Sequence, residues 1–199
     1  FLGVRPEGGY QIARLNGYAP EAVSTSDIDS IINTFSTVSD AVSLAYTVYG
    51  HPMYQITFPT AQRSFLFDTV SNIWSEVQTG VALQARHVTE LGVVFNSQVY
   101  ASDYASGSVY TLSPSVYTDN GTPIKRQVRT KHLHNGGARF NLSEVFLDME
   151  VGVGLQSGQG SAPLIMLQVS KDGGQTFGIE RRLSIGLVGT YLTRVVARR

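Results

Sequence analysis

Apolar and polar residues alternate over residues 145–153, where every odd position carries Val, Leu or Met and where Asp148 and Glu150 lie between them. A period of two predicts a half-buried strand whose two carboxylates face solvent. The run LIMLQV at 164–169 is almost continuously apolar, which predicts a central strand. The glycine-rich residues 152–160 between them are typical of a surface loop. We therefore predict a small β-sandwich or platform module over residues 136–199.

A helical pattern occurs early in the chain, within an N-terminal segment of residues 1–40. The run STS at 24–26 offers N-cap residues, and Asp27 and Asp29 fall in the first turn. The apolar residues recur at helical spacing: Ile28, Ile31, Ile32 and Phe35. The pattern predicts one short helix, which must pack on other elements to persist.

The middle of the chain contains two copies of one pattern of short strands separated by turns. Tyr54 in the first copy corresponds to Val99 in the second, and Phe65 corresponds to Val109, which are offsets of 45 and 44 residues. A four-stranded unit that recurs at this period is typical of β-propeller blades. We therefore predict two propeller-like blades over residues 41–135.

The predicted fold class is all-β: β-propeller-like four-stranded blades, followed by the β-sandwich or platform module, with one short N-terminal helix. Residues 123–133 are expected to form the last strand of the second blade. Two blades cannot close a propeller, which needs at least about four, so we expect an open pair or further blades in a longer chain. The chain begins at Phe1 and stops at Arg199 in mid-pattern, and we expect it to be a piece of a longer protein.

The 199 residues include 15 Lys and Arg and 15 Asp and Glu, so the formal net charge is zero. The balance is −6 over residues 1–120 and +6 over residues 121–199. This asymmetry favours an oriented interface with a partner or another copy, although two modules can also simply differ in charge. The absence of cysteine excludes disulfides, thiolate metal sites and a cysteine nucleophile. No apolar run approaches the roughly 18 residues of a membrane helix, so no membrane partner is expected.

The run SKDGGQTF at 170–177 matches the Asp-box pattern S-x-D-x-G-x-T-F/W known from sialidases and other propellers. We expect a tight structural turn in which the carboxylate accepts hydrogen bonds from turn amides, the second glycine takes a positive φ and the phenylalanine packs under the loop. The residues of this turn are Ser170, Asp172, Gly174, Thr176 and Phe177. The pattern marks a turn and carries no catalytic role.

The sequence predicts no enzyme, no cofactor and no metal site. Sialidase chemistry requires a cluster of arginines beside a tyrosine nucleophile, and the sequence places no such cluster. Asp148 and Glu150 share the solvent face of the predicted strand, so they are interpreted as surface groups and not as a glycosidase pair. His132 and His134 form an H-x-H pair without an evident third ligand. No small-molecule substrate is therefore expected.

One polar stretch remains a candidate contact surface. If residues 123–133 form a strand, its period places Lys125, Gln127, Arg129 and Lys131 on one face. The three cations, Lys125, Arg129 and Lys131, could contact phosphates or an acidic partner. Charges on an edge strand also protect it against aggregation, and the sequence leaves both interpretations open.

Four stretches resemble, in the same order, the packaged-DNA stabilisation proteins of short-tailed bacteriophages, which are tail-hub or nozzle components. They are RLNGYAPEAVSTSDIDSIIN, HPMYQITFPTAQRSFLFDTVSNIWSE, SGSVYTLSPSVYTDNGTPIKRQVRT and GVGLQSGQGSAPLIMLQVSKDGGQTFG. The resemblance implies a non-enzymatic structural protein of the virion, made in the bacterial host cytoplasm. It implies a ring, hexameric in the family, which extends the portal channel and helps to retain packaged DNA. The implied partners are other copies and other tail proteins, namely the portal adaptor and a tail needle or spike, with DNA contact in the channel.

Two other functions remain open at this point. The Asp-box and the aromatic-rich hairpins are compatible with a carbohydrate-binding or sialidase-like propeller domain. A generic propeller scaffold that binds protein partners is the third interpretation.

Overall fold

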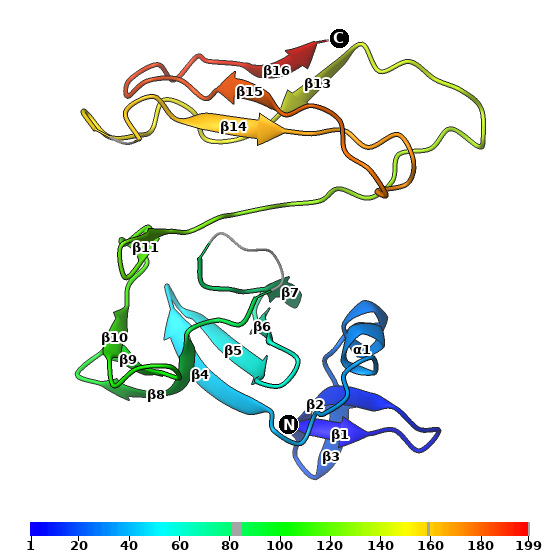
Figure 1. Cartoon of the computed structure of the whole chain (residues 1–199), viewed down its shortest axis with the longest axis vertical. Helices are drawn as coiled ribbons and strands as arrows, with labels where there is room; N and C mark the ends of the chain where they lie inside the picture. The colour runs from blue at the N-terminus through cyan, green and yellow to red at the C-terminus, as the bar shows by residue number, and fades with distance from the viewer. Residues whose placement is uncertain (81–84, 159, 199) are drawn as a thin grey trace. The chain divides into compact units, whose positions relative to one another are not determined.

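A computed structural model describes residues 1–80, 85–158 and 160–198 of the chain. The chain divides into two compact units, unit 1 (Phe1–Gln127) and unit 2 (Val128–Arg199), which are described separately (Figure 1). The described residues form several small antiparallel sheets and one short N-terminal helix. The predicted β class and the helix are therefore confirmed, whereas the sheets of the described residues do not close into a propeller.

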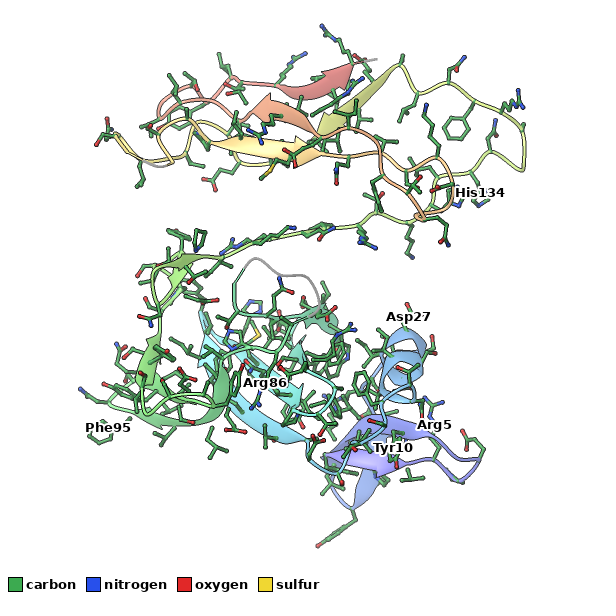
Figure 2. The ribbon with its side chains drawn as sticks, viewed as in Figure 1. Arg5, Tyr10, Asp27, Arg86, Phe95 and His134 are labelled. Carbon is green, nitrogen blue, oxygen red and sulfur yellow. The ribbon has the colours of Figure 1, made fainter. Side chains whose placement is uncertain are left out.

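The N-terminal layer of unit 1 is a three-stranded sheet, β1 (Leu2–Val4), β2 (Tyr10–Asn16) and β3 (Ala19–Ala22), followed by α1 (Ser26–Ile32). Thr25 caps the helix, because its hydroxyl accepts a hydrogen bond from the backbone N–H of Ile28 at 3.4 Å. The carboxylate of Asp29 is buried, accepts a hydrogen bond from the hydroxyl of Ser24 and pairs with Arg5, which extends near the helix (Figure 2). In the described part of the chain, no helix has the length and apolar character needed to cross a membrane.

The second layer is a four-stranded antiparallel meander, as the sequence pattern predicts. Its strands, in spatial order, are β4 (Val42–Val48), β5 (His51–Phe58), β6 (Arg63–Asp68) and β7 (Ile73–Glu76). Phe67 and Trp74 lie opposite each other in the ladder, and their rings stack with centroids 4.8 Å apart. The indole N–H of Trp74 donates to the backbone carbonyl of Val23 at 2.8 Å, so this tryptophan connects the meander to the N-terminal layer.

The third layer has three antiparallel strands, and the prediction of a fourth is wrong. It comprises β8 (Thr89–Phe95), β9 (Gln98–Asp103) and β10 (Val109–Leu112). A separate two-stranded hairpin follows, β11 (Thr118–Asp119) and β12 (Thr122–Pro123), and residues 124–134 form no strand. Ile124 and Val128 are both exposed, so this segment has no buried face to hold it against a sheet.

The middle sheet of unit 1 is covered on both faces by residues from the other two layers. On one face, Ile56, Phe58 and Phe65 join a buried cluster with Ile12 and with residues of and near the helix, namely Ile28, Ile32 and Val38. On the other face, Leu44 of β4 lies against Gly92 of β8. The sheet β4–β7 thus forms the centre of a three-layer stack.

Hydrogen bonds between polar side chains join the second and third layers. Gln55 donates to the hydroxyl of Thr89 at 3.0 Å, and that hydroxyl lies 2.7 Å from Nδ1 of His87. The backbone N–H of His87 donates to Ser64 Oγ at 2.9 Å, and Ser64 Oγ lies 2.8 Å from the hydroxyl of Thr57. Gln55, Thr57, Ser64 and Thr89 are each at most 3% exposed, so these bonds satisfy polar groups that water cannot reach.

Unit 2 contains two two-stranded antiparallel sheets. One pairs β13 (Glu144–Leu147) with β16 (Val195–Arg198), and the other pairs β14 (Leu164–Leu167) with β15 (Arg181–Ser184). Val195 and Ala197 are buried, whereas Phe146, Leu164 and Met166 are at least half exposed. Unit 2 therefore has few fully buried apolar side chains and a large exposed apolar surface.

Two strand predictions in unit 2 need correction. The alternation of exposed and half-buried residues continues from 145 to 151, but the hydrogen-bonded strand ends at Leu147. The run at 164–169 gives a strand that ends at Leu167, and it pairs with one neighbour instead of lying centrally. The continuous apolar run therefore predicts the presence of a strand correctly. It does not predict that both faces of the strand are buried, because exposed and half-buried residues alternate along β14. Of the predicted glycine-rich loop over residues 152–160, Gln159 lies outside the described residues.

We predict that Gly92→Ala destabilises unit 1 by about 1–3 kcal/mol, as expected when a packed interior is overfilled. A Cβ at Gly92 would lie 2.5 Å from Leu44 Cδ1 and 2.8 Å from the carbonyl oxygen of Tyr100. Urea unfolding followed by the fluorescence of Trp74, the single tryptophan, reports on this unit. Gly107→Ala is the matched control, because a Cβ there meets no atom within 4 Å. Equal unfolding midpoints for the two variants would contradict the packing described here.

We predict that unit 1 loses stability as the pH falls below about 6.5, and that His87 contributes to this loss. Burial lowers the pKa of His87 from its ordinary 6.5, while Asp119 opposes the shift. The neutral ring accepts the backbone N–H of Thr89 at Nδ1, which a protonated ring cannot do. The unfolded chain therefore takes up the proton first, and the free energy of unfolding falls by up to about 1.4 kcal/mol per pH unit.

The measurement compares urea midpoints at pH 5 and pH 8 for the native chain and for His87→Asn, whose amide oxygen can accept the same N–H. The variant is expected to show a smaller difference between the two pH values. An unchanged difference would assign the acid sensitivity to other groups.

Candidate functional site

The predicted turn at residues 170–177 is held by two side chains. Both carboxylate oxygens of Asp172 accept hydrogen bonds from the backbone N–H of Thr176 at 2.9 Å, and one also accepts the Thr176 hydroxyl. Ser170 Oγ accepts the backbone N–H of Gly174 at 2.8 Å and donates to Asp172 at 2.7 Å. Gly174 has a φ of +93°, a conformation that residues with a Cβ rarely adopt. The hydrogen-bond partners of the Asp172 carboxylate, Ser170 and Thr176, thus both belong to the turn.

Two further turns in unit 1 are also held by an aspartate that accepts hydrogen bonds within the turn. The sequence analysis did not predict these aspartates. Asp68 accepts the backbone N–H of Val70 at 2.9 Å and the hydroxyl of Ser71 at 2.8 Å. Asp103 accepts the backbone N–H of Ala105 at 2.7 Å and the hydroxyl of Ser106 at 2.8 Å. The shared signal is Asp-x-x-Ser that begins at the last residue of a strand, DTVS at 68–71 and DYAS at 103–106.

These two turns occupy different places in their sheets. The Asp68 turn joins β6 to β7 and lies at the same end as the β4–β5 hairpin, since His51 Nδ1 is 2.8 Å from the Asp68 carboxylate. The Asp103 turn joins β9 to β10 and lies at the end opposite the β8–β9 hairpin. The two predicted blades therefore do not repeat their turns in equivalent positions.

The three turn carboxylates stay ionised in neutral solution. Hydrogen bonds donated by Thr176 and Ser170 hold the pKa of Asp172 well below its ordinary value, and the bond from His51 does the same for Asp68. The amide of Ala105, followed by the hydroxyls of Ser106 and Tyr110, lowers the pKa of Asp103 to about 2. A carboxylic acid that donates protons in catalysis needs a raised pKa, so these three groups are suited to holding turns.

Residues 123–133, called the basic segment below, do not form the cationic row that the strand pattern predicts. Because residues 124–134 form no strand, Lys125, Arg129 and Lys131 do not share a strand face. Arg129 instead places its guanidinium 5.2 Å from the ring centroid of Phe177. Phe177 is 42% exposed, so it is partly covered rather than buried under the turn. Two groups that the sequence singled out separately are thereby brought together within unit 2.

Lys125 and Lys131 are exposed and have no described ion pair with any residue that the structure covers. Their charges are therefore available to solvent, to phosphates or to an acidic surface. Arg129 differs from them, because its cation already contacts an aromatic ring.

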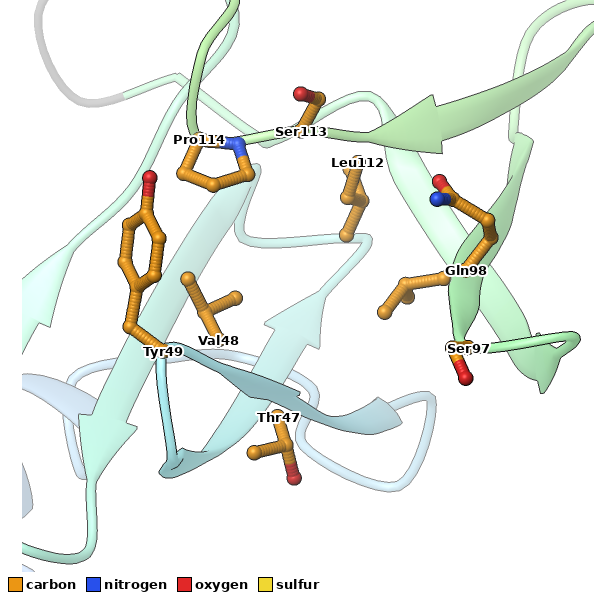
Figure 3. A pocket seen from close by; sticks show the side chains of 9 residues that line it. Thr47, Val48, Tyr49, Ser97, Gln98, Leu112, Ser113 and Pro114 are labelled. Carbon is orange, nitrogen blue, oxygen red and sulfur yellow. The ribbon is translucent and has the colours of Figure 1, made fainter.

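A shallow pocket lies in the described part of each unit. In unit 1 a pocket of about 180 Å³ lies beside the β4–β5 and β8–β9 hairpins, and Figure 3 shows Tyr49 and Pro114 on one side of it and Gln98 on the other. In unit 2 a pocket of about 350 Å³ lies along β13 and β16 and includes Asp148 and Arg194 in its lining. Neither pocket contains a pair of carboxylates.

Tyr49, at the mouth of the first pocket, has an unusual backbone conformation. Its φ is +49°, in the left-handed region, which costs an L-residue about 1–2 kcal/mol. Asn and Gly are the residues that normally occupy such two-residue hairpin turns.

Within the described ranges, no group of three or more His, Asp or Glu side chains is arranged to hold a metal ion, and His132 and His134 belong to no such group.

We predict that Asp172→Ala lowers the melting temperature of unit 2 and removes the hydrogen-exchange protection of the Thr176 amide. The cause is the loss of the acceptor that receives this N–H. Calorimetry and amide exchange followed by NMR provide the two measurements. Asp148→Ala is the control, because Asp148 is exposed and has no described hydrogen bond in the turn. An Asp172→Ala chain that retains protection at Thr176 would show that the carboxylate is dispensable for the turn.

Comparison with known protein families matches residues 125–199 to the family described as Bacteriophage P22 Gp10, beta-sandwich. Comparison with curated proteins returned no match. The matched residues include all of unit 2 and less than half of the chain. The match supports the predicted C-terminal β-sandwich, and over this part of the chain it agrees with the predicted resemblance to a bacteriophage protein family. The C-terminal part of this chain is therefore similar to a bacteriophage β-sandwich domain.

Proposed function

We propose that this chain is a non-enzymatic structural component of a bacteriophage tail, and that it belongs to a ring-forming hub. In this proposal the ring extends the portal channel and helps to retain packaged DNA. The observation that carries the proposal is the match of residues 125–199 to the bacteriophage P22 Gp10 β-sandwich family. The resemblance of residues 14–33, 51–76 and 106–130 to packaged-DNA stabilisation proteins extends the argument to unit 1.

The exposed apolar surface of unit 2 supports a role in assembly. Phe146, Leu164, Met166 and Tyr191 are each at least 50% exposed, and Leu192 is 97% exposed. Exposed apolar surface of this kind loses its contact with water when a partner protein covers it. A structural module that becomes buried against neighbouring tail proteins accounts for this surface.

The distribution of charge supports an oriented arrangement of copies. Residues 1–120 carry −6 and residues 121–199 carry +6. In a ring, the acidic part of one copy would meet the basic part of the next, a head-to-tail contact that closes when the rotation permits. Complementary charges of this kind fix the register of an interface more than they add affinity.

The proposed partners are other copies of the chain, the portal adaptor and a tail needle or spike, with DNA passing through the channel. The proposed location is the virion tail, after synthesis in the bacterial cytoplasm. The turn carboxylates support the non-enzymatic assignment, because their hydrogen bonds are used within the chain.

A genetic experiment tests the proposal as a whole. Deletion of the gene from the phage or prophage that carries it is expected to give particles that lack a complete tail and lose their DNA. Supply of the protein in trans should restore both. Infectious, DNA-filled particles from the deletion strain would contradict the proposed function.

A second experiment tests the basic segment within the complete protein. We predict that Lys125→Gln with Lys131→Gln reduces ring assembly or genome retention, because both exposed cations face a neighbouring copy or the DNA in this proposal. The affinity for DNA should also depend less on salt concentration, since each lost phosphate contact removes about 0.9 from the slope of log affinity against log salt.

Arg129→Lys is the matched control for this experiment. It keeps the positive charge of the segment and changes the guanidinium that contacts Phe177. If the double variant assembles and retains DNA as the native protein does, at both low and moderate salt, the two lysines are not contact residues.

A further inference from the structure

We infer that the pocket beside the β4–β5 and β8–β9 hairpins of unit 1 binds one ring of a neutral saccharide, and that Tyr49 is its stacking platform. The inference does not depend on the proposed tail function. It rests on three observations: the strained conformation of Tyr49, the exposure of its ring and the chemistry of the pocket lining.

The first observation concerns the choice of residue at the hairpin turn. Val48, the last residue of β4, pairs with His51, the first residue of β5, so Tyr49 and Gly50 form a two-residue turn in which both have positive φ, +49° and +81°. Asn or Gly at the first position would avoid the strain that a tyrosine side chain causes there. Local backbone preference therefore does not explain Tyr49.

The second observation removes the ordinary compensation for such strain. Tyr49 is 80% exposed, so burial in the core does not offset the free-energy cost of its positive φ. Its hydroxyl has no hydrogen bond among the residues that the structure describes. Residues that break a local rule without structural gain tend to lie at functional sites.

The third observation is the geometry of the pocket. Figure 3 shows the ring of Tyr49 and the ring of Pro114 together on one side, with Gln98 opposite and Val48 and Leu112 between them. The volume of about 180 Å³ is below the range of about 300–1,000 Å³ that drug-sized ligands occupy. One small ring fits this size, whereas a longer ligand would extend into solvent.

The neighbouring hairpin turn fixes the opposite wall. Asn96 and Ser97 connect β8 to β9, and both also have positive φ, +48° and +58°. The turn sets the position of Ser97 and of Gln98, the first residue of β9. Two tight turns from different sheets thereby form part of the lining, and Ser113 and Pro114, in the loop that follows β10, complete it.

The lining chemistry selects the class of ligand. No charged residue lines the pocket, so phosphates, carboxylates and ammonium groups find no counter-charge. The lining includes four polar side chains, those of Thr47, Ser97, Gln98 and Ser113. Ser113 Oγ already lies 2.9 Å from Ser115 Oγ, and Figure 3 shows the side chain of Thr47 pointing away from that of Val48. Ser97 and Gln98 therefore provide the hydroxyl and amide groups that a ligand can bond. A pyranose ring matches this set, since its C–H face packs on an aromatic ring while its hydroxyls bond to neutral polar groups.

The first experiment is NMR titration of the full chain with a panel of methyl glycosides of glucose, galactose, mannose and rhamnose. Because the pocket is small and open, we expect millimolar affinity for at least one glycoside. Amide shifts should concentrate on residues 47–49, 97–99 and 112–114. The absence of such shifts for every glycoside, or shifts confined to other residues, would overturn the inference. Binding of a proline-rich peptide without any glycoside would overturn it as well.

The decisive variant is Tyr49→Asn, which separates a binding role from a structural one. Asn tolerates the positive φ, so the variant should unfold at a higher urea concentration than the native chain, and it should lose at least tenfold in glycoside affinity. Tyr49→Phe should retain most of the affinity, because the ring remains. A Tyr49→Asn chain that is less stable than the native one, or that still binds glycoside equally, would overturn the inference.

Tyr18→Asn is the matched control for surface exposure. Tyr18 is fully exposed at 105%, belongs to unit 1 and does not line the pocket. Its substitution should leave glycoside affinity unchanged. An equal loss of affinity in this variant would show that the effect at Tyr49 is not specific to the pocket, which would also overturn the inference.

Discussion

Unit 1 depends on the hydrogen bonds that connect Thr89 and His87 to Gln55 and Ser64 across two neighbouring sheets. Gln55, Ser64 and Thr89 are cut off from water, so each one needs its partner in the facing layer. The bonds fix where β8 begins relative to β5 and β6, and hence where Gly92 meets Leu44. Apolar contacts alone would tolerate small sliding of the two sheets, whereas a buried polar network tolerates very little.

The turns at the ends of the strands form a second level of order. Asp68, Asp103 and Asp172 each satisfy several backbone and hydroxyl donors, and the pKa of each carboxyl is lowered as a result. This arrangement uses acidic residues as turn-forming groups in both units. It also explains why these three carboxyl groups, whose pKa values are lowered, are poor candidates for acid catalysis.

The two units differ in how completely they bury their apolar residues. Unit 1 has a cluster in which Phe58, Phe65 and Ile32 are fully buried, whereas unit 2 has two small sheets with large apolar side chains in solvent. A module of this kind gains stability when neighbours cover it. That property supports the proposed place in an assembly, and the similarity of residues 125–199 to a bacteriophage β-sandwich family points in the same direction.

The sequence by itself determined the local features whose cause lies within a few residues. The N-cap and spacing of the helix, the meander over β4–β7 and the alternating burial of residues 145–151 follow from short-range pattern. The Asp-box pattern gave the location of one turn, and the recurring Asp-x-x-Ser would have located two more.

Tertiary structure decided the features that depend on a distant partner. A strand needs a neighbour, and residues 124–134 find none in the described structure, so the cationic row does not form and Arg129 contacts Phe177 instead. The pocket at Tyr49 combines hairpins 47 residues apart in sequence, Val48–His51 and Phe95–Gln98, whose meeting depends on how two sheets stack. Periodicity records which face of a segment is apolar, but it does not record which other segment covers that face.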